Sequence, residues 1–179
     1  MRDRYKIVHE EGIHFLTSTI VEWLPVFTKK VYFDIIIDSL NYCVQNKGLR
    51  LYAYVILENH LHLIASAEAL SPALTSLRKF TARNIVDQLE QDGVSWLLNQ
   101  LAYYKKRYKT NSDYQIWQEG MHPKLIQSEQ MMRQKIKYIH SNPVRRGYVA
   151  RPEDWVYSSA RNYILEDDSV IAVCRDWAW

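Results

Sequence analysis

Two histidines separated by one residue, His60 and His62, follow a β-branched and aromatic run in the stretch YVILENHLHLIA, residues 54–65. Successive side chains of a β-strand face opposite ways, so both imidazoles point to one side of the predicted strand and Leu61 points to the core. Two imidazoles in this arrangement could share one divalent cation. The pattern is equally typical of a solvent-facing pair on a half-exposed strand, so a second feature must decide between the two.

A tyrosine and an asparagine four residues apart form that second feature, in KIKYIHSNPVRRGYV, residues 135–149. We interpret this stretch as the end of a helix that begins near Ser128 and ends at Asn142, because Pro143 disfavours helical geometry in the residue before it. The spacing puts the phenol of Tyr138 and the amide oxygen of Asn142 on one helix face. The amide could complete a ligand set with the two histidines. Such a mixed set, with open positions, suits magnesium or manganese better than a closed structural zinc site.

With these residues the chain resembles the REP-associated tyrosine transposases, within the single-tyrosine HUH transposases of bacterial insertion sequences. The resemblance rests on four motifs that span roughly residues 13–163 in matching order: YVILENHLHLIA, WQEGMHPKLI, YIHSNPVRRGYV and EDWVYSSARNY. It implies that His60 and His62 are the paired metal-binding histidines. It also implies that Tyr138 is the nucleophile and Asn142 the third protein ligand.

The chemistry of these four residues predicts strand transfer on DNA. A tyrosine hydroxyl has a pKa of about 10 and attacks a phosphodiester poorly unless a cation draws charge off the phosphate. Mg²⁺ or Mn²⁺ held by the histidines and Asn142 would orient the phosphate toward Tyr138 and neutralise the charge of the transition state. The expected product is a 5′-phosphotyrosine link with a free 3′-hydroxyl. A second 3′-hydroxyl can reverse this attack and join strands without ATP. One position departs from the family pattern: Glu58, before Asn59 and His60, stands where many relatives have proline. This difference removes no reactive group.

Basic residues gather around the proposed nucleophile, which bears on the substrate. The formal net charge is only +3, yet residues 101–150 hold ten Lys and Arg against three acidic residues. A DNA backbone that passes between the histidine strand and the tyrosine helix must be accessible from one side without a paired strand. This favours single-stranded DNA over duplex. The resemblance implies short palindromic repeats folded into hairpins. The candidate phosphate or base contacts are Arg78, Lys79, Arg83, Lys105, Lys106, Arg107, Tyr108, Arg145 and Arg146.

The order of elements predicts a single domain over residues 1–179, with a core of about 13–149 and a C-terminal extension of about 150–179. We expect strands at 13–21, 50–57, 60–66 and 114–117, and helices at 29–46, 71–91, 95–104 and 128–142. This β-α-β-β-α-β order is typical of an α+β, ferredoxin-like or RRM-like antiparallel sheet with helices packed on one face. In the extension we expect a packed turn, a short helix and a possible edge strand, with three packing anchors: Trp155, Trp177 and Trp179.

Composition indicates an ordinary globular protein. No stretch is long and apolar enough to cross a membrane, and the N-terminal residues MRDRYKIVHEEG lack the apolar segment of a signal peptide, so we expect a cytoplasmic protein. Cys43 and Cys174 lie in apolar runs and are expected to be buried free thiols. The spacing of the site residues is compatible with a monomer or a homodimer, in which the tyrosine serves its own chain or that of a partner.

Three other functions fit parts of the sequence. A non-catalytic RRM-like module could stack bases on Tyr52, Tyr54 and the basic loop, but it has no need to place two histidines, a tyrosine and an asparagine together. A replication-type or relaxase-type HUH nickase would use the same residues, although the short chain favours the transposase. A domesticated enzyme that cleaves repeats for its host would share the sequence features of an active mobile element.

Overall fold

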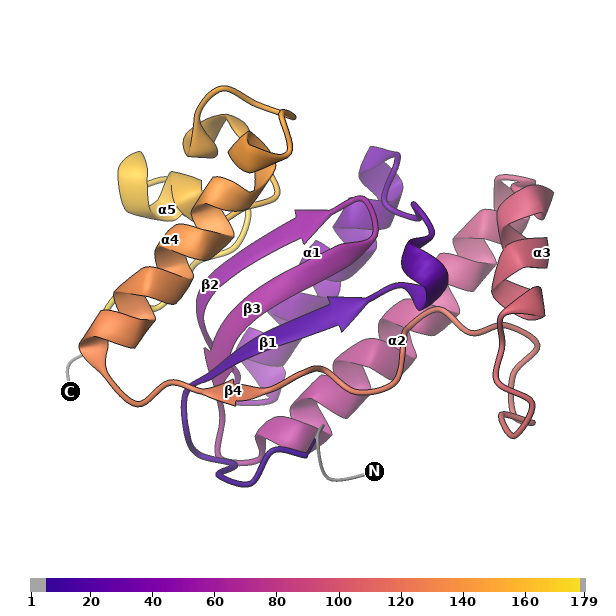
Figure 1. The fold of residues 1–179 in the computed structure, drawn as a ribbon, viewed down its shortest axis with the longest axis horizontal. Coiled ribbons are helices and arrows are strands. Elements are labelled where there is room, and N and C mark those ends of the chain that lie inside the picture. The colour runs from indigo at the N-terminus through magenta and orange to yellow at the C-terminus, as the bar shows by residue number, and fades with distance from the viewer. Residues whose placement is uncertain (1–5, 178–179) are drawn as a thin grey trace.

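The computed structural model describes residues 6–177, and within them four strands form one antiparallel sheet in the order β2-β3-β1-β4 (Figure 1). The strands are β1 (His14–Thr19), β2 (Arg50–Leu57), β3 (His60–Ser66) and β4 (Lys124–Leu125). β2 and β3 form a hairpin, and β1 pairs with β3 on one side and β4 on the other. This order confirms the predicted α+β class with an antiparallel sheet, and the hairpin strands have the predicted bounds.

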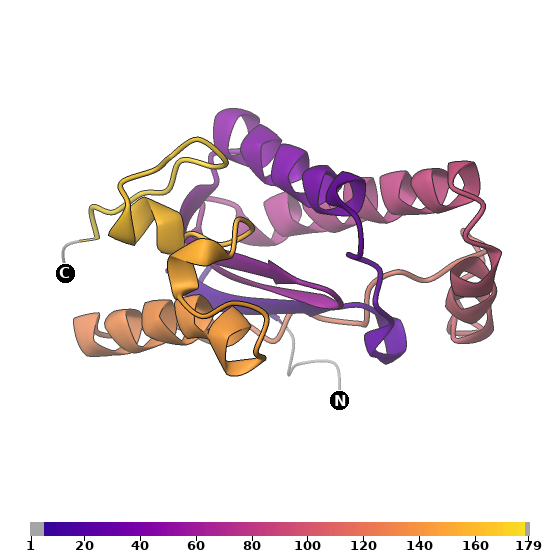
Figure 2. The ribbon, with the colours of Figure 1, turned by 90° about the horizontal axis from the view of Figure 1, so that it is seen from above.

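Two long helices, α1 (Lys30–Asn46) and α2 (Leu70–Gln91), cover one face of the sheet, and α3 (Ser95–Tyr103) follows α2 (Figure 2). Alternate strand residues supply this side of the core, including Leu16 of β1 and Leu61 and Leu63 of β3. No helix within the described residues 6–177 is long and apolar enough to span a membrane.

The opposite face of the sheet is covered by α4 (Glu129–Arg145), which Figure 2 shows on the other side from α1 and α2. Met132, Ile136 and Ile139 of α4 form a second apolar cluster with strand residues such as Phe15 and Ile64. The prediction that the helices pack on one face therefore holds for α1 and α2 and is wrong for α4. The strands are buried on both faces, and a strand pattern alone does not say which helix covers which face.

The predicted strand at 114–117 is also wrong, because this segment makes only an isolated bridge between Ile20 and Trp117. Its apolar side chains are buried, and the indole of Trp117 donates a hydrogen bond to Thr81 on α2. Because this segment is buried, its residues show the same apolar pattern as a strand. The fourth strand is instead β4, two residues long, which pairs with the start of β1.

Helix α4 does not end at Asn142 as predicted, because it continues through Pro143 to Arg145. A proline this close to the C-terminus removes one backbone hydrogen bond and leaves the turns before it intact. The helix closes with a bond from the N–H of Tyr148 to the carbonyl of Pro143 (3.0 Å), at a left-handed Gly147 (φ 74°). Asn142 therefore keeps helical geometry and its position one turn after Tyr138.

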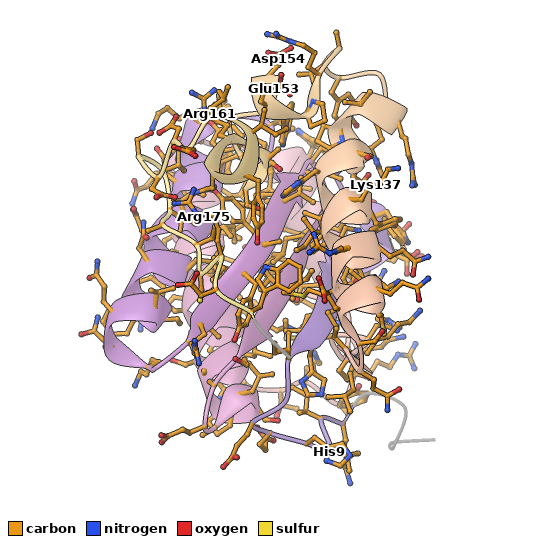
Figure 3. All side chains as sticks on the ribbon, turned by 90° about the vertical axis from the view of Figure 1, so that its left-hand side faces the viewer. His9, Lys137, Glu153, Asp154, Arg161 and Arg175 are labelled. Atoms are coloured by element: carbon orange, nitrogen blue, oxygen red, sulfur yellow. The ribbon has the colours of Figure 1, made fainter. Side chains whose placement is uncertain are left out.

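The C-terminal extension lies along the free edge of β2 and contains η3 (Pro152–Asp154) and α5 (Ala160–Ile164), as the predicted turn and short helix. The N–H of Ile56 donates to the carbonyl of Tyr157 (2.9 Å), and the N–H of Ser159 donates to that of Tyr54 (2.9 Å). This segment covers an edge that would otherwise expose unpaired backbone groups. Figure 3 shows Arg161 and Arg175 in this extension, where they pair with Asp167 and Asp168 respectively.

The remaining predictions for the extension are met in part. Residues 169–177 form no strand, although the N–H of Cys174 donates to the carbonyl of Leu51 (2.8 Å). The indole of Trp155 donates to the carbonyl of Ile56 (2.9 Å) and Trp177 borders the second apolar cluster, whereas Trp179 lies outside the described residues. Both cysteines are free, with Cys43 buried and Cys174 only half-buried.

Candidate active site

His60 and His62 lie on the face of β3 that α4 covers. Leu61, between them, packs in the core on the opposite face, as the strand period requires. The two imidazoles are 3% and 6% exposed, and their ring centroids are 4.9 Å apart. The two imidazoles are therefore buried and adjacent beneath a helix, and the solvent-facing alternative for this pair is excluded.

Hydrogen bonds fix one nitrogen of each ring. Nδ1 of His60 lies 2.7 Å from Oδ1 of Asn59, whose own amide N–H donates to the carbonyl of Trp23 (3.1 Å). Nδ1 of His62 lies 2.8 Å from the hydroxyl of Thr17, its partner in register on β1. Because the amide oxygen of Asn59 can only accept, His60 carries its proton on Nδ1. Its Nε2 then presents a lone pair, which is the form that binds a metal.

Burial keeps both imidazoles neutral. It lowers the pKa of His60 to about 4, with a further contribution from the nearby Arg146 guanidinium. It lowers the pKa of His62 to about 3, assisted by repulsion from His60. Both rings therefore hold free lone pairs at neutral pH, and protons do not compete for them.

Tyr138 approaches this pair from α4. Its half-buried ring meets His62 edge-on at a centroid distance of 5.3 Å, and Phe15 contacts both rings. Two cations flank the phenol, with the guanidinium of Arg145 5.0 Å and the ammonium of Lys135 5.8 Å from the ring centroid. The sequence-predicted tyrosine and histidines, 76 residues apart from His62 to Tyr138, are therefore neighbours in a positively charged setting.

Asn142 is buried on α4, one turn beyond Tyr138. The next turn ends at Arg146, which donates to Glu58 at 2.6 Å and so ties α4 to the turn before the histidines. The helix thus contacts His62 at Tyr138 and the start of the hairpin turn at Arg146, and Asn142 lies between these two contacts along α4. Within residues 6–177, no group of three or more His, Cys, Asp or Glu could hold a metal.

Two proteins of known family resemble the chain. A Haemophilus influenzae protein, assigned by its name to the REP-associated tyrosine transposases, is 26% identical over 107 residues, which is 60% of this chain and 56% of the relative. A solved structure of a REP-associated tyrosine transposase bound to a REP hairpin superposes with a TM-score of 0.67 at 17% identity, covering 100% of this chain and 92% of that one. Both matches are to REP-associated tyrosine transposases.

This agreement confirms the resemblance that the four motifs indicate. The structural match establishes a shared fold, and the chain spans a little over half the length of the H. influenzae transposase. No protein-family model matches the chain. The sequence relative and the solved structure thus both belong to the family that the motifs resemble, and the solved structure adds a shared fold.

The candidate DNA contacts fall into two groups on opposite sides of the sheet. Arg145 and Arg146 lie at the end of α4 beside Tyr138, and Arg146 is neutralised in part by Glu58. The exposed residues Lys79, Arg83 and Tyr108 line a cavity of about 830 Å³ between α2 and the loop after α3. Lys105 is half-buried in that loop, and Lys106 and Arg107 are exposed. Only the α4 group therefore lies beside Tyr138 among these predicted contacts.

Arg78 differs from the other members of the second group. Its guanidinium donates to the backbone carbonyls of Gln118 and Gly120, and its side chain is only partly exposed. These bonds hold the segment before β4 against α2. Part of its donor capacity is thus used within the fold, and contact with DNA stays a prediction for this residue.

His140 lies on α4 between Tyr138 and Asn142 but faces away from the histidine pair. It is buried, with Nε2 2.9 Å from the hydroxyl of Ser159, and its ring lies 5.1 Å from that of Tyr163. Ser159 in turn accepts a bond from the N–H of Tyr54 (2.9 Å). His140 thus joins α4 to the C-terminal extension and β2, and burial lowers its pKa to about 4.

This buried histidine predicts a loss of stability in mild acid. The unfolded chain takes up a proton at His140 near pH 6.5 and the folded chain only near pH 4, so the free energy of unfolding falls as the pH drops through that window. Between pH 7 and 5 the wild type should lose about 2 kcal/mol more than His140→Gln. Urea denaturation with EDTA at both pH values measures this. Equal losses in the two proteins would contradict a neutral buried His140.

Proposed function

We propose that this chain is a transposase of the REP-associated tyrosine type. It would cleave and rejoin single-stranded DNA beside repeat hairpins, in the cytoplasm, through a 5′-phosphotyrosine intermediate. The observation that carries the proposal is the 5.3 Å contact between the rings of Tyr138 and His62, from elements far apart in the sequence. Tyr138 and the two neutral imidazoles lie together there, Asn142 follows one turn later on the same helix, and flanking cations give the setting a positive charge.

The donor set fits a hard divalent cation. Nδ1 of His60 donates to Asn59, and Nδ1 of His62 would donate to the Thr17 hydroxyl, which would leave each Nε2 available as a ligand; Asn142 offers an amide oxygen. Three neutral ligands with room for water and phosphate oxygens suit Mg²⁺ or Mn²⁺. When bound, the cation would supply Lewis-acid stabilisation of the phosphate charge.

The protein's own groups account for the rest of the reaction. The Tyr138 oxygen would form a bond to phosphorus while the bond to the 3′-oxygen breaks, and the phenol proton would pass through water to the 3′-oxygen, which leaves as a hydroxyl. Arg145 and Lys135 would favour a negatively charged phenol and phosphate at this point. Burial of the nucleophile ring between Phe15 and His62 would hold it in one orientation.

A non-catalytic RRM-like module is less well supported. Tyr52 and Tyr54, the strand aromatics that could stack bases, are 3% and 0% exposed. Helix α4 covers the sheet face that such a module would offer to RNA. A replication-type nickase would share the chemistry, so rejoining of strands is the property that separates it from a transposase.

Incubation of the wild type with end-labelled single-stranded DNA, carrying a repeat hairpin from its own genome and a single-stranded flank, tests the proposal. We expect a covalent protein–DNA adduct on a denaturing gel with Mg²⁺ or Mn²⁺, and none with EDTA or with the fully duplex form. Added DNA with a free 3′-hydroxyl should convert the adduct to joined strands. Folded protein that binds the hairpin and forms no adduct with either metal would contradict it.

Replacement of Asn142 by alanine should raise the Mn²⁺ concentration needed for half-maximal cleavage by about tenfold or more, because an oxygen ligand is lost from the set. The measurement is a titration of adduct formation with Mn²⁺. Asn84→Ala, on α2 and on the other side of the sheet, is the matched control and should titrate like the wild type. An unchanged requirement in Asn142→Ala would remove this residue from the ligand set.

A further inference from the structure

A tryptophan borders the histidine pair and is open to solvent. Trp23 ends η2 (Val21–Trp23), directly after β1, and its ring meets His60 edge-on at a centroid distance of 5.5 Å. The side chain is 53% exposed, whereas His60 beside it is 3% exposed. The residue therefore presents part of its large aromatic surface to solvent at the rim of the candidate active site.

The backbone at this turn is held in a costly conformation. Glu22 and Trp23 both have positive φ angles, 51° and 56°, in a region that L residues other than glycine and asparagine rarely adopt. The turn is fixed by a bond from the amide of Asn59 to the carbonyl of Trp23, and by one from the N–H of Trp23 to the carbonyl of Ile20 (3.0 Å). Strain of this kind persists only where surrounding contacts impose it, and it concentrates at functional sites.

The same contacts tie the position of Trp23 to that of the histidines. Asn59 bridges the two, because its amide N–H holds the Trp23 carbonyl while its oxygen holds Nδ1 of His60. The N–H of Ile20 donates to the carbonyl of Asn59 (2.8 Å), and that of Phe27 donates to the carbonyl of Glu58 (2.9 Å). The backbone of Trp23 is thus held at a fixed place relative to His60, and the indole contacts the imidazole from there.

We propose that Trp23 is a stacking platform for an unpaired base next to the scissile phosphate, an inference that rests on the proposed function. Indole is the best stacking surface among side chains, and stacking on it accepts any base. The neighbourhood favours nucleic acid over a protein partner, because Arg145 and Lys135 beside Tyr138 give the adjoining part of the site a positive charge that suits phosphate. The base would lie on the indole while its phosphate faces those cations.

Binding without metal isolates this contact from catalysis. In EDTA, Trp23→Ala should bind a hairpin with a single-stranded flank about five- to a hundredfold more weakly than the wild type, and Trp23→Phe should recover most of the loss. A blunt hairpin without the flank should bind both proteins equally. Trp96→Ala is the matched control, since Trp96 on α3 is 57% exposed and lies on the side of the molecule away from α4 (Figure 1).

An abasic scan of the flank identifies the base. At one position, removal of the base should weaken wild-type binding as much as Trp23→Ala does, and should not weaken Trp23→Ala further. The inference is overturned if Trp23→Ala binds the flanked hairpin as well as the wild type, if the blunt hairpin loses as much affinity, or if no position couples. The proposed function fails in a different experiment, in which the wild type forms no covalent adduct with DNA when metal is present.

Discussion

Tyr138→Phe is expected to abolish the covalent protein–DNA adduct and to leave hairpin binding within about twofold of the wild type. The substitution removes only the hydroxyl, so the ring keeps its contacts with His62 and Phe15 and the helix keeps its packing. Loss of a nucleophile removes a step for which no other group in the site can substitute. We expect cleavage to fall by about a thousandfold or more.

The measurement uses hairpin DNA labelled on the flank that becomes joined to the protein, with the adduct resolved on a denaturing gel. Tyr42→Phe is the matched control, because Tyr42 is exposed on α1, across the sheet from α4, and should form adduct at the wild-type rate. Adduct formation by Tyr138→Phe at more than a few per cent of the wild-type rate would mean that a different residue attacks the phosphate.

The local periodicities of the chain place most of the candidate site. The hairpin at 50–57 and 60–66 and the helix carrying Tyr138 follow from short-range patterns, and these fix which side chains share a face. That the two faces meet depends on packing between distant segments. The resemblance carried by the sequence motifs implies that the strand face and the helix face meet. The contact between the rings of Tyr138 and His62 shows that they do.

Residues that act through register or through turn geometry could not be found from a pattern. Thr17 meets His62 only because β1 pairs with β3 in a particular register. In the sequence Trp23 is a single apolar residue after a strand, and the role that we propose for it depends on left-handed backbone at Glu22 and Trp23, which these residue types do not favour. Asn59 was within reach of sequence reasoning, since it directly precedes the histidine pair, but its two bonds require the position of Trp23.

The errors share a physical cause. The segment 114–117 and the face covered by α4 were both inferred from residues that are apolar because they are buried, and burial does not specify the element that buries them. The predicted helix ends too early, at Asn142, because the residue before a proline disfavours helical geometry. In the structure, the packing of Ile139 and the hydrogen bonds that close the last turn outweigh this preference. Tertiary contacts outweighed local preference in each case.

His62→Gln is expected to lower metal-dependent cleavage by about a hundredfold or more and to leave hairpin binding in EDTA unchanged. An imidazole ligand is lost, whereas the polar character and approximate size of the side chain are kept. Asparagine or glutamine amides are weaker ligands than imidazole for Mn²⁺ and related ions. Adduct formation across a Mn²⁺ titration and hairpin affinity in EDTA are the two readouts.

His14→Gln is the matched control for this variant. His14 is a buried histidine of the same sheet, on the neighbouring strand, with its Nδ1 2.8 Å from the carbonyl of Gly12. It has no role in the proposed ligand set, so its replacement should cost stability without changing the metal requirement. Parallel loss of cleavage and hairpin binding in His62→Gln would indicate damage to the fold instead of the metal site.

The double variant His62→Gln with Tyr138→Phe separates a shared step from two independent ones. If the cation serves the attack by Tyr138, each single change removes the same step, and the double variant should be no worse than Tyr138→Phe alone. Multiplied losses would mean that part of the residual cleavage in Tyr138→Phe still depends on the metal, as it would for metal-assisted hydrolysis. Gel analysis distinguishes these outcomes, because hydrolysis leaves cleaved DNA without an adduct.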